Sequence, residues 1–163
     1  MKKRKLIMAI GFPGVGKSTY ANNLENTIII SRDNIVLEQG IEGETYNDIW
    51  KRLNTKMQKN IDKKLLERYE FALKYTNKDI YLDLTNLTIK SRKKWNIIEV
   101  KEKYNLEIIG LVFNTDLDTL KFRLNERSKL GKTIPFDRLN IMINSFEQPT
   151  TEEGFDFIKT MYN

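Results

Sequence analysis

The sequence predicts an α/β fold in which helices cover both faces of a parallel sheet of four to five strands. Two observations support this prediction. Short apolar segments alternate with longer segments of helical periodicity along the 163 residues, as in folds built from strand–helix–strand units. A glycine-rich segment, IGFPGVGKSTYA at residues 10–21, also follows the first apolar segment and precedes a helical one. We expect one domain that spans residues 1–163.

Five segments have the length and composition of strands. Most are compact and apolar, as expected for strands that are buried on both faces of a sheet. Ligands of such sheets bind beyond the carboxyl ends of the strands. The expected strands are residues 5–10, 27–30, 79–84 and 106–113, and residues 155–161 form either a fifth strand or a short helix.

Helical signals fill the segments between these strands. Apolar residues recur every four positions from Ile49 to Tyr69, which predicts one long amphipathic helix. Serine and aspartate can cap the starts of two further helices. The expected helices are residues 17–24, about 45–75, one that Ser91 caps, one from Asp116 to about Arg127, and one after Pro135.

The charge and the missing residue types narrow the chemistry. The chain has 28 basic and 22 acidic side chains and a formal net charge of +6. This balance fits either a polyanionic partner such as nucleic acid or simply a lysine-rich surface. The absence of cysteine and histidine excludes disulfides, zinc clusters and a thiol nucleophile. A general base must then be Asp, Glu, Lys or Tyr.

The amino terminus, MKKRKLIMAIG, is charged and then apolar. Its apolar run is too short for a secretory signal and ends in the glycine-rich segment. No apolar segment approaches the roughly 18 residues of a membrane span. We therefore expect a cytoplasmic protein without a membrane partner.

The pattern G-x-x-x-x-G-K-[ST] fits residues 11–18 without deviation. In such a loop, successive backbone N–H groups point at phosphate oxygens, and the following helix adds a partial positive charge. Lys17 is expected to reach the β- and γ-phosphates, and the Ser18 hydroxyl to bind Mg²⁺. The sequence therefore predicts a P-loop that binds a nucleoside triphosphate, with ATP as the expected ligand. The expected binding residues are Gly11, Gly14, Val15, Gly16, Lys17, Ser18 and Thr19.

Two polar motifs follow the second and third predicted strands. Asp33, in SRD, is the leading candidate for the base that accepts a proton from an attacking hydroxyl, and Arg32 can contact phosphate. Asp83, in DLTN, can hold Mg²⁺ through water, while Thr85 and Asn86 can position substrate or phosphate oxygens. Asp, Asn and Thr are also common in turns and caps, so each motif has a purely structural alternative.

A basic segment follows the helix that begins at Asp116. Arg123 and Arg127 are four residues apart and share one helix face, and a lysine-rich stretch follows. The segment at about residues 123–135, called the lid segment below, can close over a triphosphate and deliver an arginine to the developing charge. The alternative is a solvated basic helix end.

The order of these motifs resembles the kinase domain of the phage 5′-hydroxyl polynucleotide kinase family. The resemblance spans almost the whole chain and includes Arg92 and Trp95 in KSRKKW and the closing PTTEEGFDFI. It implies the sheet order 2-3-1-4-5, ATP and Mg²⁺ as donor and cofactor, and the 5′-hydroxyl end of DNA or RNA as acceptor. A phage origin, and hence a host cytoplasm, is implied only by this resemblance.

The resemblance also implies roles for individual residues. Asp33 corresponds to the base that activates the 5′-hydroxyl and Arg32 to its neighbour in the acceptor site. Arg127, with Arg123 as second choice, corresponds to the lid arginine. The substrate contacts implied at the strand end and in the helix after it are Asp83, Thr85, Asn86 and Arg92.

The chain departs from the family in three respects. The spacing from the R-x-x-x-R pair, Arg123 and Arg127, to Pro135 is looser than in the family. Val36 stands where some members carry a basic residue three positions after the aspartate. The D-x-D-G-T motif of the phosphatase domain in larger members is missing from this sequence, so no 3′-phosphatase activity is expected. Two other functions stay open: a kinase of a small hydroxyl substrate (a nucleoside, sugar, antibiotic or, as in zeta-like toxins, a nucleotide sugar) and a non-catalytic nucleotide-binding module. The oligomeric state is left open.

Overall fold

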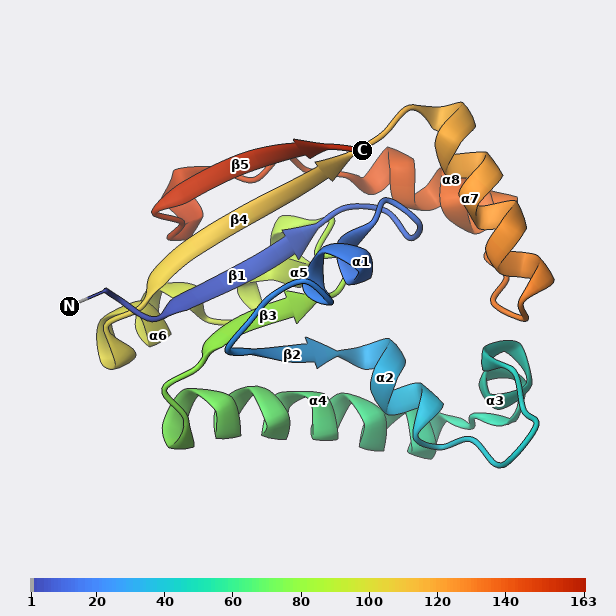
Figure 1. Cartoon of the computed structure of the whole chain (residues 1–163), viewed down its shortest axis with the longest axis horizontal. Helices are drawn as coiled ribbons and strands as arrows, with labels where there is room; N and C mark the ends of the chain where they lie inside the picture. The colour runs from blue at the N-terminus through green and yellow to red at the C-terminus, as the bar shows by residue number, and fades with distance from the viewer. Residues whose placement is uncertain (1) are drawn as a thin grey trace.

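Five parallel strands form the centre of the computed structural model, which describes residues 2–163. Their order across the sheet is β2-β3-β1-β4-β5, as the family resemblance implies (Figure 1). The last segment is a strand and not a helix, and it pairs with its neighbour in parallel. The strands are β1 (Lys5–Ile10), β2 (Thr27–Ser31), β3 (Asp79–Asp83), β4 (Glu107–Asn114) and β5 (Phe157–Tyr162).

Side chains of the central strand alternate between two hydrophobic cores. Met8 and its even-numbered neighbours pack into the core that contains Leu65, and Ala9 packs into the core that contains Leu120 and Leu139. Both faces of β1 are covered, which is why its sequence is a continuous apolar run. The edge strand β5 is mostly exposed, in keeping with its polar and aromatic side chains.

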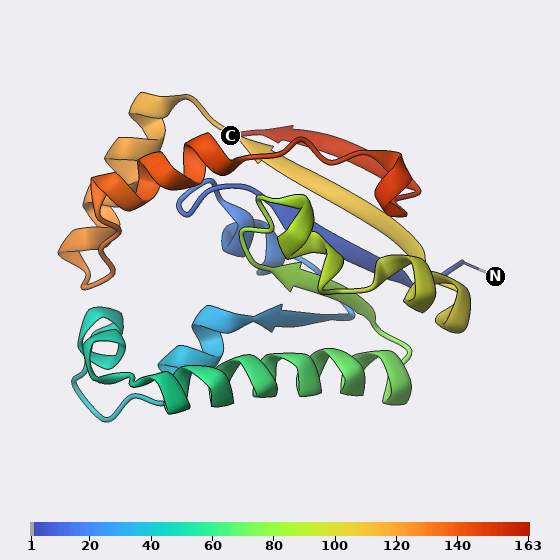
Figure 2. The same ribbon diagram turned by 180° about the vertical axis from the view of Figure 1, so that it is seen from behind.

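Helices cover both faces of the sheet, and α4 runs alongside the edge strand β2 in both views (Figures 1 and 2). None of the helices in residues 2–163 combines the length and apolar character that a membrane span requires. The helices are α1 (Lys17–Ala21), α2 (Arg32–Leu37), α3 (Tyr46–Arg52), α4 (Thr55–Tyr75), α5 (Ile89–Lys93), α6 (Ile97–Tyr104), α7 (Leu117–Lys129), α8 (Phe136–Ser145) and the 3-10 helix η1 (Thr151–Glu153).

The single long helix predicted over residues 45–75 is wrong, because the chain forms two helices there. Leu53 leaves the helical conformation, with ψ at 112°, and Asn54 caps α4 by accepting a hydrogen bond from the Met57 N–H at 2.9 Å. The apolar period continues across this break because Ile49 and Leu53 still pack into the same core as α4. Periodicity therefore records the shared core and not the continuity of the helix.

Two other helix boundaries also differ from the prediction. Ser91 does not cap a helix, because Thr88 caps α5 and its hydroxyl accepts from the Ser91 N–H at 3.0 Å. The short helix α2, which the Ser31 side chain caps, begins within the SRD motif and is absent from the predicted helices. The prediction that Asp116 caps α7 is confirmed, with its carboxylate accepting from the Thr119 N–H at 2.8 Å.

The break between α3 and α4 yields a stability prediction. Asn54→Ala removes the cap of α4 and should lower the free energy of unfolding by about 1 kcal/mol, as measured by urea denaturation. Asn60→Ala is the matched control, because Asn60 is an exposed residue inside the same helix, where alanine has the higher helix propensity. Equal stability of the two variants would contradict the capping role.

Candidate active site

A cavity of about 1100 Å³ lies beyond the carboxyl ends of β1, β2 and β3. Its walls come from the loop after β1, from α2 and α3, from the end of β3, and from α7 and the segment that leads into α8. This is where parallel α/β sheets bind their ligands. The cavity therefore collects the loop, SRD, DLTN and lid motifs around one space.

The P-loop surrounds the Lys17 side chain, which is only 8% exposed. Its ammonium donates to the carbonyl oxygens of Gly11 at 2.9 Å and Phe12 at 2.7 Å. Gly16 has φ at 100°, and a Cβ atom there would meet the Asn163 amide nitrogen at 2.9 Å. The left-handed backbone conformation at this position is what requires glycine, while the end of the Asn163 side chain could shift.

The loop residues divide into those that line the cavity and those that hold the loop. Gly14, Gly16, Lys17, Ser18 and Thr19 line it. Gly11 and Val15 lie in the protein interior, and the Gly11 N–H donates to the Thr85 carbonyl at 2.9 Å. Gly11 and Val15 therefore support the conformation of the loop and do not line the cavity themselves.

Burial lowers the pKa of Lys17 to about 8, although the nearby Asp83 carboxylate opposes this change. An ammonium group in such a place is desolvated, with only loop carbonyls as its direct partners. A phosphate oxygen would supply the negative charge that this position favours.

Ser18 and Asp83 form an oxygen-rich pair on the wall of the cavity. The Ser18 hydroxyl donates to Asp83 Oδ2 at 2.8 Å. Burial raises the pKa of Asp83, and the Ser18 hydrogen bond and the Lys17 charge act in the opposite direction. Hydroxyl and carboxylate oxygens are the ligands that Mg²⁺ prefers, so these two residues fit a magnesium ion, directly or through water.

Asp33 faces the same cavity and has two strong partners. Its Oδ1 accepts from the Tyr46 hydroxyl at 2.9 Å, and its Oδ2 accepts from the Lys132 ammonium. Burial raises the pKa of Asp33, but the Lys132 ion pair and the Tyr46 hydrogen bond more than offset this effect, so that the pKa lies below its usual value. Asp33 is therefore an ionised carboxylate at neutral pH.

Arg32 lies on the α3 side of the cavity. Its Nε donates to the exposed Asp62 carboxylate at 2.8 Å, and its guanidinium carbon stands 5.3 Å from the centroid of the Trp50 ring. The Trp50 ring is nearly parallel to that of Tyr46, at 10°, with the centroids 6.2 Å apart. An aromatic and cationic surface therefore adjoins Asp33.

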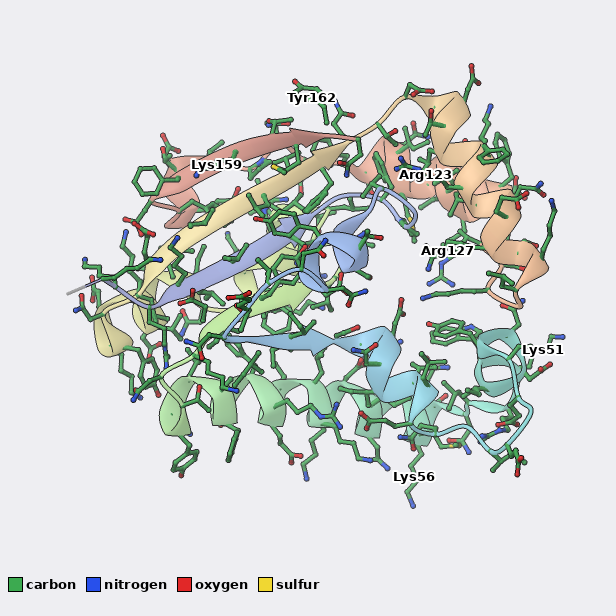
Figure 3. All side chains as sticks on the ribbon, in the orientation of Figure 1. Lys51, Lys56, Arg123, Arg127, Lys159 and Tyr162 are labelled. Carbon is green, nitrogen blue, oxygen red and sulfur yellow. The ribbon has the colours of Figure 1, made fainter. Side chains whose placement is uncertain are left out.

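The two lid arginines approach the phosphate loop from α7. Arg123 donates to the Gly14 carbonyl at 3.4 Å, and Arg127 points into the cavity (Figure 3). The Arg127 charge contributes to the lowered pKa values of both Lys17 and Asp33. Within residues 2–163, the Arg127 guanidinium has no hydrogen-bond partner, which leaves it available for a ligand.

The lid segment is docked against α3. The Asn47 amide donates to the Thr133 hydroxyl and accepts from the Thr133 N–H, each at 3.0 Å. The Asn47 N–H also donates to the Gly131 carbonyl at 2.9 Å. These contacts join the two walls of the cavity on the side away from the sheet.

The structure does not bring Asn86 and Arg92 to the cavity, which corrects their expected role as substrate contacts. Arg92 is 1% exposed, pairs with Glu153 through two nitrogens at 2.8 and 3.0 Å, and donates to the Asn86 carbonyl at 3.0 Å. The Asn86 amide donates to the Ala9 carbonyl and accepts from the Trp95 indole. Both side chains hold the backbone behind the site, while Thr85 does line the cavity.

A family model described as an AAA domain matches residues 6–149. The chain belongs to this AAA domain family. Its P-loop, parallel sheet and strand order agree with that assignment.

The sequence and structure of this AAA domain are similar to those of several other proteins. A bifunctional polynucleotide phosphatase/kinase of Schizosaccharomyces pombe is 28% identical over 156 residues, which cover 93% of this chain and 32% of the relative. A chain in the structure of the Pnkp1/Rnl/Hen1 RNA repair complex is 25% identical, with a TM-score of 0.68, over 96% of this chain and 48% of that chain. Kti12 of Chaetomium thermophilum, solved in complex with ADP-AlF3, shares the fold at 13% identity, with a TM-score of 0.61 over 96% of this chain and 88% of that chain.

The AAA domain thus spans about a third of the curated relative's length and about half of the repair-complex chain. Its fold is that of a P-loop nucleotide-binding domain. The relatives' names therefore describe proteins that are longer than the compared part.

Several residues that line the cavity were not predicted as site residues. Tyr46 and Trp50 fall within the helix predicted over residues 45–75 but outside its apolar series from Ile49 to Tyr69, and no motif in the sequence marks them as site residues. Arg138 and Asn163 reach the cavity only through the tertiary fold. A basic residue soon after Pro135 is the one signal that could have indicated Arg138.

The buried ion pair predicts a stability effect of Arg92. Arg92→Met leaves the largely buried Glu153 carboxylate without its charged partner and should lower the free energy of unfolding by about 3 kcal/mol or more, as measured by denaturant titration. The double variant with Glu153→Met should recover part of this loss, since no charge is then left unpaired. A fully stable Arg92→Met protein that binds its acceptor poorly would instead support a substrate contact.

The lowered pKa of Lys17 predicts a pH dependence of nucleotide binding. The free AAA domain loses the Lys17 ammonium as the pH rises through about 8, whereas a bound triphosphate favours the charged form. Affinity for ATP should be flat below this pH and fall by up to about tenfold per pH unit above it. Calorimetric titrations on both sides of this pH measure the effect. Lys17→Met should bind ATP weakly at every pH, without the decline above about pH 8. A wild-type affinity for ATP that stays constant over this range would contradict the role of the Lys17 ammonium.

Proposed function

We propose that this chain is an ATP-dependent kinase that transfers the γ-phosphate of ATP to the 5′-hydroxyl end of DNA or RNA. The proposal rests mainly on the position of Asp33, which lines the same cavity as the P-loop. Of the other acidic residues on this cavity, Asp83 bonds to Ser18 of the P-loop, where the two residues fit a magnesium ion, and Glu126 pairs with the exposed Lys129 at 2.5 Å. Asp33 is thus the carboxylate best placed to receive a hydroxyl proton.

The relatives support this proposal from a different direction. The Schizosaccharomyces pombe relative is named a polynucleotide phosphatase/kinase, and the matching solved chain belongs to an RNA repair complex. Membership of the P-loop class supports phosphoryl transfer in general, and these two names favour a polynucleotide acceptor over a small one. The net charge of +6 is consistent with a polyanionic acceptor.

In the proposed reaction, the 5′-oxygen attacks the γ-phosphorus while the bond from this phosphorus to the β–γ bridging oxygen breaks, which releases ADP. Asp33 orients the hydroxyl and takes its proton. Each carboxylate oxygen has two acceptor positions, so the contacts with Tyr46 and Lys132 leave room for this hydrogen bond. Such transition states are loose, and the low pKa of Asp33 therefore suits a base that accepts its proton late.

The remaining residues stabilise charge. Lys17 moves from the loop carbonyls to the β- and γ-phosphates, and Arg127 neutralises the transferred group from the lid side. Mg²⁺ held near Ser18 and Asp83 would neutralise charge on the phosphate oxygens. Thr85 and Arg32 line the same cavity.

The direct test is the transfer of labelled γ-phosphate from ATP to a 5′-hydroxyl oligonucleotide. Asp33→Asn should lower kcat/KM by about 10²- to 10⁴-fold, since it removes the proton acceptor, while ATP still binds. The control Asp118→Asn changes an exposed carboxylate in the first turn of α7 and should leave transfer unchanged. Full turnover by Asp33→Asn would remove Asp33 from this role. Transfer to a nucleoside or sugar but not to a dinucleotide would favour a kinase of small substrates.

A further inference from the structure

The aromatic pair on α3 has no part in the transfer steps above. Tyr46 and Trp50 are four residues apart, so both side chains leave the same face of the helix. Their rings are nearly parallel, and both line the cavity. The Trp50 side chain packs against the core that contains Ile49 but is only partly buried. The helix therefore presents an aromatic surface to the space that Asp33 faces.

This surface lies close to the proposed base. The Tyr46 hydroxyl donates to Asp33 at 2.9 Å, and the Tyr46 ring adjoins Trp50. A 5′-hydroxyl held by Asp33 is joined to its own nucleobase through a single sugar. The base of the 5′-terminal nucleotide therefore falls in the neighbourhood of the α3 rings, whatever the rest of the strand does.

A cation stands beside the same rings. The Arg32 guanidinium lies 5.3 Å from the Trp50 centroid, and Nε is its one nitrogen with a hydrogen-bond partner in the part of the chain that the structure describes. The outer nitrogens can therefore donate to a phosphate, while the guanidinium plane can itself stack on a base. Val36, further along α2, is apolar and fully buried, so Arg32 is the cation that α2 brings to this cavity.

Resting on the proposed function, we propose that Trp50 is a base-stacking residue of the acceptor site. Its indole stacks on the nucleobase of the 5′-terminal nucleotide, and Arg32 binds the phosphate that follows this nucleotide. Aromatic rings bind bases with little regard to sequence, so the contact selects nucleotides over sugars without selecting one base. Specificity for a polynucleotide end would then come from α3 and α2, and the P-loop would supply only the donor site.

The test compares two acceptors that differ only in the terminal base. One is a 5′-hydroxyl oligonucleotide, and the other carries an abasic sugar at its 5′ end. Wild type should prefer the complete acceptor by about 10- to 100-fold in kcat/KM. Trp50→Ala should lose this preference through a higher KM for the complete acceptor, and Trp50→Phe should keep most of it. Lys51→Ala is the control, because Lys51 is on the same helix but points away from the cavity (Figure 3).

Fluorescence gives a second readout that does not depend on turnover. The chain has two tryptophans, and Trp95 is 2% exposed, so a change in emission on binding the complete oligonucleotide reports Trp50. This quenching should be weaker with the abasic oligonucleotide and absent in Trp50→Phe.

Each result decides the matter. If Trp50→Ala lowers kcat/KM equally on both acceptors, or if neither oligonucleotide changes the tryptophan emission of the wild type, the stacking role is overturned. The proposed kinase function would still stand. Failure of wild type to phosphorylate any oligonucleotide would overturn the proposed function and the stacking role together.

Discussion

The candidate site depends on the parallel pairing of three neighbouring strands, β2, β3 and β1. Ser31, the last residue of β2, pairs with Asp83, the last residue of β3, and the residue after β1, Gly11, donates its N–H to the Thr85 carbonyl. Because parallel strands run in one direction, the chain leaves all three at the same edge of the sheet. The P-loop, SRD and DLTN motifs, which are far apart in sequence, are neighbours for this reason alone.

Charged side chains at this edge of the sheet are stabilised by polar or oppositely charged partners. Lys17 is desolvated and bonded to loop carbonyls, while Asp33 is ionised and paired with Lys132. Arg127 approaches both from the lid and lowers both of their pKa values. An anion that entered the cavity would find cations from the P-loop, the lid and α2 around it, whereas a neutral ligand would gain little from them. The electrostatics of the site therefore favour a polyanionic ligand such as a triphosphate.

The parts of the fold that could be predicted are those that depend on neighbouring residues in the sequence. The strands, the P-loop and the Asp116 cap follow from short apolar runs, glycine spacing and a capping residue, each of which acts over a few positions. The roles of Asn86 and Arg92 could not be predicted in this way. Their partners, Ala9 and Glu153, are far away in sequence, and a polar residue near a strand end has the same local pattern whether it faces a ligand or the core.

The break in the helix predicted over residues 45–75 determines where the aromatic side chains of the site lie. In Figure 1, α3 is set apart from α4, which follows the edge of the sheet. A continuous helix would carry Tyr46 and Trp50 along that same line, because each helical residue advances the chain by a fixed rise. The break at Leu53 and Asn54 lets α3 turn toward the lid, where Asn47 bonds to Thr133 and Tyr46 bonds to Asp33. The capping residue that ends the helical pattern is therefore also what places the aromatic wall of the cavity opposite the lid arginines.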